Sequence, residues 1–268
     1  MSDVNMIEAV ELAAQLPDAN LLMLQVTSAE VYAAAHLPGA LLVTPAELVC
    51  GIPPATGRLP DLPQLEALFA RLGYAPDKDI VVYDDEGGGW AGRLAWTLDV
   101  IGHRRWTYLN GGMHAWQAAG LQFEQTPVTV SPSTVELTID TAPVAEIADV
   151  LAAIEDTQQA VWDVRSEQEY LGLRQAAARV GHIPGAINWD WMYLKDPADN
   201  MRLTAGIAEQ LQALGLADKA IITHCQTHHR SGLSYMVGRL LGLDIRAYHG
   251  SWSEWGNRDD TPIELPGA

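Results

Sequence analysis

Residues 221–232 read IITHCQTHHRSG, and this stretch decides the fold. Residues 221–224 combine β-branched side chains with apolar character, which indicates a buried strand. A short polar loop follows, and apolar residues then recur at helical spacing over 231–241, with Gly242 placed to cap that helix. Strands that alternate with helices predict a parallel α/β sheet. The flanking sequence continues the alternation, with a strand expected at 160–165 and helices at 143–156 and 204–214.

The same pattern occurs earlier in the chain. Residues 80–93, IVVYDDEGGGWAGR, again form an apolar run that ends in a polar loop. Three pairs of landmarks, HLPGA with HIPGA, the two strands, and GGMHAW with GSWSEW, are separated by 146, 141 and 139 residues. Ordered landmarks at nearly constant spacing predict a duplicated domain. We expect domains at 1–121 and 141–268, each a mainly parallel sheet flanked by helices, and a Thr/Pro/Ser-rich linker at 122–140.

The charge and composition of the chain argue against two classes of binding partner. The 268 residues include 34 acidic and 16 basic side chains, for a formal net charge of −18. Such a chain repels polyphosphates and anionic membrane surfaces, so we expect neither nucleic acid nor a membrane as a partner. The N-terminus has no basic segment followed by an apolar one, and no apolar run approaches the ~18 residues of a membrane helix. A cytoplasmic location is therefore expected, with free thiols.

Cys225 stands where binding sites form in open α/β sheets. It follows the strand at 221–224 and precedes a helix that is expected to begin near Ser231. The N–H groups of the loop can turn inward as an anion cradle, and the helix dipole and Arg230 favour thiolate over thiol. Cys225 is therefore a candidate nucleophile. Cys50, near the loop-like GIPPATG and without a nearby His or Arg, is interpreted as incidental.

The loop must be compared with two other kinds of site. His224, His228 and His229 flank Cys225, but a catalytic zinc needs about three converging protein ligands, and a tight turn points these side chains apart. We expect no metal, with His228 and His229 at the rim of the pocket. A phosphatase loop has an arginine after five residues, where this chain has Ser231. Because Arg230 comes after only four, the smaller loop fits a sulfur atom better than a tetrahedral oxyanion.

These motifs resemble those of the rhodanese, or sulfurtransferase, family over nearly the whole chain. YAAAHLPGA at 32–40 matches the amino-terminal signature of the family, and YHGSWSEW at 248–255 matches its carboxy-terminal signature. CQTHHR at 225–230 and DDEGGGW at 84–90 are similar to the bacterial tandem-domain thiosulfate sulfurtransferases. HxPGA alone would be weak, but the combination is highly specific. The resemblance implies two rhodanese-like α/β domains.

The resemblance also implies what the loop does. Cys225 would carry the transferred sulfur as a persulfide, which the loop backbone would cradle. Arg230 would help to hold the anionic donor, and the structural alternative is that it pairs with Glu254 or Asp163 and supports the loop. Trp191 would line the pocket, with core packing as an equal alternative. The residues expected to bind substrate are Gln226, Thr227, His228, His229, Arg230 and Trp191.

The two copies differ at the site. The amino-terminal copy would be catalytically inactive, because its strand brings Asp84 or Asp85 to the cysteine position. Asp163 and Arg165 have no charged counterparts in that copy, and we interpret them as a structural ion pair at a strand end.

Position 169 bears on the identity of the donor. Sulfurtransferases that use 3-mercaptopyruvate carry an arginine just before the aromatic that corresponds to Tyr170, whereas this chain has Glu169. A carboxylate would not hold the carboxylate of that donor, so thiosulfate is favoured. We expect sulfur transfer from thiosulfate to cyanide, a cellular thiol or a sulfur-accepting protein, without a cofactor. The alternatives are a 3-mercaptopyruvate sulfurtransferase and a persulfide carrier that delivers sulfur to a partner protein.

Overall fold

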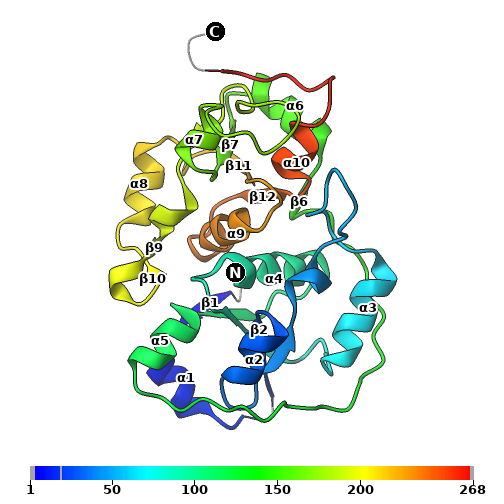
Figure 1. Cartoon of the computed structure of the whole chain (residues 1–268), viewed down its shortest axis with the longest axis vertical. Helices are drawn as coiled ribbons and strands as arrows, with labels where there is room; N and C mark the ends of the chain where they lie inside the picture. Colours follow the sequence, from blue (N-terminus) through cyan, green and yellow to red (C-terminus); the bar gives the residue numbers. More distant parts are fainter. Residues whose placement is uncertain (1–3, 19, 266–268) are drawn as a thin grey trace.

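A five-stranded sheet in which every pairing is parallel forms the amino-terminal half of the molecule. The computed structural model describes residues 4–18 and 20–265 (Figure 1). The central strands are almost wholly buried, which explains their continuous apolar sequence. In spatial order the strands are β1 Asn5–Ile7, β5 Trp106–Leu109, β4 Asp79–Asp84, β2 Leu21–Val26 and β3 Leu41–Val43.

The carboxy-terminal half repeats this sheet with the same strand order. All four of its pairings are parallel, and the predicted α/β fold is confirmed in both copies. A short antiparallel pair, β9 Lys195–Asp196 and β10 Arg202–Leu203, lies outside the sheet. In spatial order the strands of the sheet are β6 Val144–Ala145, β12 Ile245–Tyr248, β11 Ala220–His224, β7 Gln159–Asp163 and β8 Ile187–Asn188.

Helices connect the strands in both halves. Within the described residues, none is long and apolar enough to cross a membrane. The first half has α1 Ala9–Gln15, α2 Ala29–Ala34, the 3-10 helix η1 Pro45–Leu48, α3 Leu62–Arg71, α4 Gly89–Val100 and α5 Gly112–Ala118. The second has α6 Ile147–Glu155, α7 Glu167–Tyr170, the 3-10 helices η2 Trp191–Leu194 and η3 Pro197–Asp199, α8 Ile207–Ala213, α9 Arg230–Leu240 and α10 Ser251–Trp255.

Two of the predicted helices differ at their starts. The helix expected at 143–156 begins only at Ile147, because residues 144–145 pair with β12 as an edge strand. The helix expected at 204–214 begins at Ile207, after Gly206. The third, expected at 231–241, spans Arg230–Leu240, and Gly242 follows it with a φ of +72°.

The HxPGA segments stabilise corresponding turns in the two copies. Tyr32 and His36 stack with ring centroids 4.0 Å apart, and the Tyr32 hydroxyl donates to the carbonyl of Ala40 at 2.8 Å. Tyr170 and His182 stack in the same way at 3.7 Å. These residues therefore have a packing role that both copies keep.

The two halves share one core, formed where α4 and α9 cross between the sheets (Figure 1). The helices touch backbone to backbone, because a methyl group on Gly92 would lie only 2.3 Å from the carbonyl carbon of Gly232. Asp99 of α4 accepts hydrogen bonds from Tyr235 and Arg239 of α9. Apolar burial and a buried ion pair thus join the two sheets.

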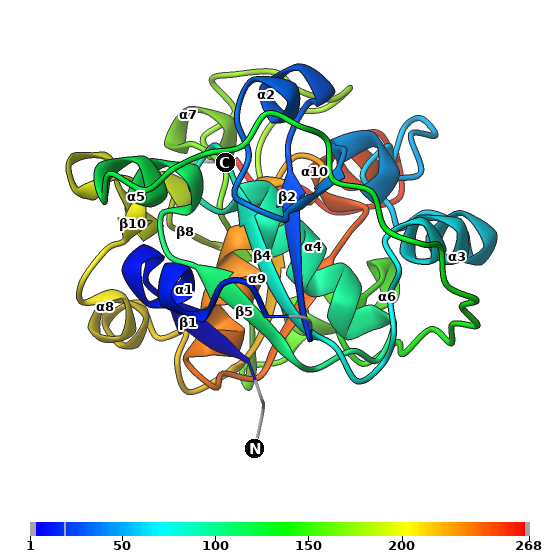
Figure 2. The same cartoon turned by 90° about the horizontal axis from the view of Figure 1, so that it is seen from below.

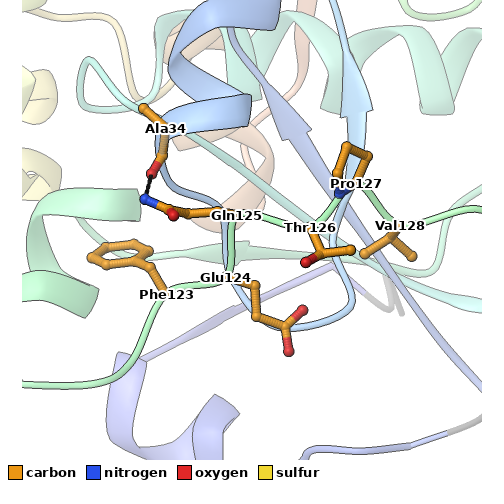
Figure 3. A pocket seen from close by; sticks show the side chains of 7 residues that line it. All are labelled: Ala34, Phe123, Glu124, Gln125, Thr126, Pro127 and Val128. Carbon is orange, nitrogen blue, oxygen red and sulfur yellow. Dashed lines mark hydrogen bonds between the residues drawn. The ribbon is translucent and has the colours of Figure 1, made fainter.

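Residues 122–140 run in an extended path over the amino-terminal half (Figure 2). Glu124 pairs with His36 as an isolated β-bridge, and the amide of Ser133 donates to the carbonyl of Ala70. Figure 3 shows the side-chain amide of Gln125 donating to the carbonyl of Ala34, beside a surface pocket lined by residues 123–128. The segment is held by backbone contacts to this half. The division into 1–121, 122–140 and 141–268 stays a prediction.

Candidate active site

Cys225 lies at the carboxyl end of β11, in the middle of the second sheet. Residues 226–229 form the loop, and α9 begins at Arg230, one residue earlier than predicted. The thiol has no exposed surface. The Ser231 hydroxyl lies 3.5 Å from Sγ. Parallel sheets place their sites at this edge.

The loop favours the thiolate form of Cys225. Burial raises the pKa of the thiol, but the Arg230 charge, the Ser231 hydroxyl and the backbone N–H groups of Ser231 and Thr227 outweigh burial and lower the pKa overall. A lowered pKa increases the fraction of thiolate, which is the nucleophilic form. The surroundings of Cys225 are therefore those of a reactive cysteine.

Arg230 forms a bidentate ion pair with Glu169. Its Nη1 and Nη2 donate to the carboxylate at 2.7 and 2.9 Å, and the Glu169 side chain is only 5% exposed. Burial raises the pKa of Glu169, but the Arg230 contacts and the Ser166 hydrogen bonds outweigh it and bring the pKa to about 2. The sequence suggested Glu254 or Asp163 as the ion-pair partner of Arg230, and both predictions were wrong. Glu254 pairs with Arg58, and Asp163 pairs with Arg165.

The three histidines next to Cys225 contact three different partners. Nδ1 of His224 contacts the carbonyl of Cys225 at 3.2 Å, and Nδ1 of His228 contacts the Ser231 hydroxyl at 2.8 Å. His229 instead contacts the carboxylate of Glu86 through Nε2. Over residues 4–18 and 20–265, no three His, Cys, Asp or Glu side chains are grouped to hold a metal ion. Burial lowers the pKa of His228 well below the usual value, so this ring is neutral at pH 7.

Aromatic rings of both halves surround His229. Trp90 stacks on it with centroids 4.4 Å apart, and Trp191 meets it edge to face at 5.6 Å. Lys195 lies 3.5 Å above the Trp191 ring and donates to the carbonyl of Glu86 at 2.6 Å. The structure thus brings Trp191 to the loop, and its role in binding substrate stays a prediction. Sequence reasoning missed Trp90 and Glu86, although their place in the repeated loop was a usable signal.

The other loop residues, Gln226 and Thr227, are held by neighbouring backbone. The side-chain amide nitrogen of Gln226 donates to the carbonyl of Ala176 at 2.7 Å. The side-chain oxygen Oε1 of Gln226 is buried without a hydrogen-bond partner. Thr227 abuts Gly57 of the amino-terminal half so closely that a methyl group there would lie 1.9 Å from the Thr227 oxygen. The first half therefore covers part of the Cys225 loop.

Asp163 and Arg165 form a fully buried ion pair at the end of β7. Nε of Arg165 donates to Asp163 at 2.9 Å, and Nη2 also donates to the carbonyl of Gly181. The guanidinium lies 4.2 Å above the Trp252 ring. These contacts fit the structural interpretation of the pair.

The corresponding loop of the first half holds a carboxylate of its own. Asp84 is the last residue of β4 and has no exposed surface, whereas the neighbouring Asp85 lies partly exposed beyond the strand. Four backbone N–H groups donate to the Asp84 carboxylate at 2.8–3.2 Å, those of Glu86, Gly87, Gly88 and Ala91. Asp84 therefore takes the place of Cys225, and this type of loop binds an anion through its amides.

Comparisons with known proteins agree with this architecture. The family model described as a rhodanese-like domain matches residues 8–119 and again 146–258. A thiosulfate sulfurtransferase of Azotobacter vinelandii is 46% identical over 261 residues, which are 97% of this chain and 96% of that protein. One of Pseudomonas aeruginosa is 47% identical over the same shares.

A solved structure supports the fold independently. The anaerobic ergothioneine biosynthesis enzyme of Chlorobium limicola superposes with a TM-score of 0.86 at 20% identity, covering 97% of this chain and 70% of that one. At this identity the likeness shows the fold alone. The predicted resemblance is confirmed by the two family matches and the full-length relatives, and this chain belongs to the rhodanese family, with two rhodanese-like domains in tandem.

Proposed function

We propose that the protein is a thiosulfate sulfurtransferase that carries sulfur on Cys225. The observation that supports this most is a cysteine with a lowered pKa, set in a loop whose counterpart binds a carboxylate through four N–H groups. The relatives that align over nearly the full chain are named for the same activity.

The reaction has two balanced steps. The Cys225 thiolate attacks the outer sulfur of thiosulfate, the sulfur–sulfur bond of the donor breaks, and sulfite leaves with the bonding electron pair. Cyanide or a thiolate then attacks the outer sulfur of the persulfide, the bond between the two sulfur atoms breaks, and the Cys225 thiolate is regenerated as thiocyanate or a new persulfide forms. The chain itself carries the group between donor and acceptor, as in other covalent catalysis.

The loop amides would hold the persulfide anion. The two N–H groups that lower the pKa of Cys225 belong to Thr227 and Ser231. In the first domain, the N–H groups of Glu86 and Ala91 hold Asp84 from matching positions on the two sides of the loop. We assign the persulfide to this cradle, with Gln226, His228, His229 and Trp191 around the donor. The first domain, with Asp84 in place of the cysteine, would be catalytically inactive.

Thiosulfate remains favoured over 3-mercaptopyruvate. Glu169 places a carboxylate directly on Arg230, the cation nearest in sequence to the nucleophile. Position 169 thus supplies a carboxylate where an arginine would be needed to bind the carboxylate of 3-mercaptopyruvate. The persulfide carrier would use the same cysteine, but it would be loaded by a protein rather than by a small molecule and would deliver the sulfur to a partner protein. The cytoplasmic location stays a prediction.

Intact mass spectrometry tests the proposal. After incubation with thiosulfate and desalting, the wild-type protein should gain about 32 Da, the mass of one sulfur atom, and cyanide should remove it. Cys50→Ser should gain the same mass, and Cys225→Ser should gain none. A persulfide on Cys50, or no gain in the wild type, would contradict the assignment. Loading by a desulfurase but not by thiosulfate would identify a carrier instead.

A further inference from the structure

Arg93 is a fully buried cation of the domain that lacks the cysteine. It lies on α4, and its Nη1 and Nη2 donate to the carbonyls of Gly57 and Leu48 at 2.7 and 2.6 Å. Its Nε–H is buried without a hydrogen-bond partner. In the part of the chain that the structure describes, no carboxylate forms an ion pair with it.

Such a charge is costly to bury. The effective penalty for removing an ion from water is several kcal/mol, and proteins usually offset it with an opposite charge. Two other guanidinium groups near the site follow this rule: the buried Arg165 pairs with Asp163, and the partly buried Arg230 pairs with Glu169. The missing anion beside Arg93 therefore needs an explanation.

Three contacts place Arg93 at the Cys225 loop. Gly57, which accepts a hydrogen bond from the guanidinium, abuts the backbone of Thr227. The guanidinium lies 4.6 Å above the Trp96 ring, and Trp96 in turn meets the ring of His228 edge to face at 4.6 Å. The backbone of Arg93 lies against Gly232, because a methyl group there would be 2.5 Å from the Arg93 nitrogen.

We propose that Arg93, supplied by the domain without a nucleophile, is the countercharge that stabilises the Cys225 thiolate and its persulfide. The proposal rests on Cys225 as the sulfur carrier. Arg230 is adjacent to the thiol, but the carboxylate of Glu169 neutralises much of its charge. Arg93 has no such carboxylate, so the thiolate is the anion that its buried charge lacks.

The protonation state of Arg93 is consistent with this role. Burial lowers the pKa of Arg93 to about 9, and the charges of Cys225 and Cys50 act in the opposite direction. The guanidinium therefore keeps its proton at pH 7. Arg93 is a positioning residue in this proposal, since it acts on the sulfur through the electric field and not by contact.

The test titrates the thiol without turnover. Cys225 is alkylated with iodoacetamide at pH values from 5 to 10. Peptide mass spectrometry measures the rate of alkylation at Cys225 separately from that at Cys50. Wild type should show a pKa below the ordinary thiol value of about 8.5. Arg93→Gln keeps an amide donor for the two carbonyls but removes the charge, and it should raise the Cys225 pKa by about one unit. Alkylation below both pKa values then slows about tenfold. Arg93→Lys should stay near wild type.

Matched controls separate charge from packing. Arg239→Gln removes a guanidinium from the same α4–α9 contact, where Asp99 is its partner, and should leave the Cys225 pKa unchanged. The double variant Glu169→Gln/Arg230→Gln removes an ion pair without changing net charge. The loss of the Arg230 charge should raise its Cys225 pKa, and the remaining charge of Arg93 should keep that pKa below about 8.5. If Arg93→Gln does not fold, the Cys225 pKa of this double variant tests whether Arg93 stabilises the thiolate.

Three results would overturn the proposal. They are an ordinary pKa in the wild type, an unchanged pKa in folded Arg93→Gln, and an ordinary pKa in the double variant. Failure of the proposed function is a separate outcome, because it appears as absent thiosulfate turnover in a protein whose thiol pKa is measured independently.

Discussion

Removal of Arg230 should destabilise the protein through Glu169. The Arg230→Ala variant leaves a carboxylate that is 5% exposed without its two hydrogen bonds and its countercharge. Breaking a buried pair from one side typically costs about 3–5 kcal/mol. The pKa of Glu169 provides a second figure: its ordinary value is 4.5 and its value here about 2. At about 1.36 kcal/mol per unit, this difference corresponds to about 3 kcal/mol, which combines the Arg230 contacts with the Ser166 hydrogen bonds and the opposing effect of burial.

The two figures agree, so the melting temperature should fall by about 10 °C in Arg230→Ala. Glu169→Gln placed in that background should recover most of the loss, because the neutral amide no longer carries an unpaired charge. The pH dependence has a definite sign. A carboxyl group with a lowered pKa stabilises the fold above its unfolded pKa of 4.5, and this contribution is lost as the pH falls from 4.5 towards 2.

Differential scanning calorimetry of the wild type, both single variants and the double variant measures the coupling. A loss below 1 kcal/mol in Arg230→Ala would refute the reasoning, and so would a double variant as unstable as Arg230→Ala. Activity gives a separate reading, because the same variant also removes a charge that lowers the pKa of Cys225. Thiosulfate turnover should fall about 10- to 150-fold, the range for one charge-assisted contact.

Three further predictions concern the chemistry of the loop. Cys225→Ser should abolish sulfur transfer and Cys50→Ser should leave it near normal in a thiocyanate assay, and a tenth of the activity remaining in Cys225→Ser would be incompatible with the assignment. Hydrolysis of an aryl phosphate should be negligible, since Ser231 stands where a longer loop would need arginine; robust hydrolysis that depends on Cys225 would contradict this. Exhaustive chelation should leave turnover unchanged. A loss of turnover that one equivalent of zinc restores would instead indicate that the histidines bind a metal.

Local patterns were enough to predict the fold. The strand at 221–224 is a buried central strand, and its apolar sequence shows this directly. The two-residue strand Val144–Ala145 could not be predicted, because it exists only through its pairing with β12. The residues just before a helix have the same sequence pattern whether or not they pair with the edge strand of a sheet. Boundaries of this kind depend on tertiary contacts rather than on propensity.

The candidate site was predictable only in part. Cys225 and the loop that follows it are adjacent in sequence, so their joint role could be inferred from one segment. Glu169 reaches Arg230 from 61 residues away, and Glu86 reaches His229 across 143. The Glu86–His229 contact follows from the packing of α4 on α9, whereas Glu169, on α7, meets Arg230 within the second half. The repeat did contain a signal for that packing, since Gly92 and Gly232 occupy matching places in the two copies.

The loop of the first domain explains how this copy can lack a cysteine at the end of β4 and still serve the site. An empty anion cradle would leave several buried N–H groups unpaired, at a cost of about 1–3 kcal/mol each. Asp84 satisfies four of them and so holds the start of α4 in place. That position sets Gly92 against Gly232 and, one residue later, directs Arg93 towards Gly57 and the Cys225 loop. Asp84 thus occupies the position that the Cys225 sulfur takes in the second domain, and the first domain keeps the shape on which the second depends.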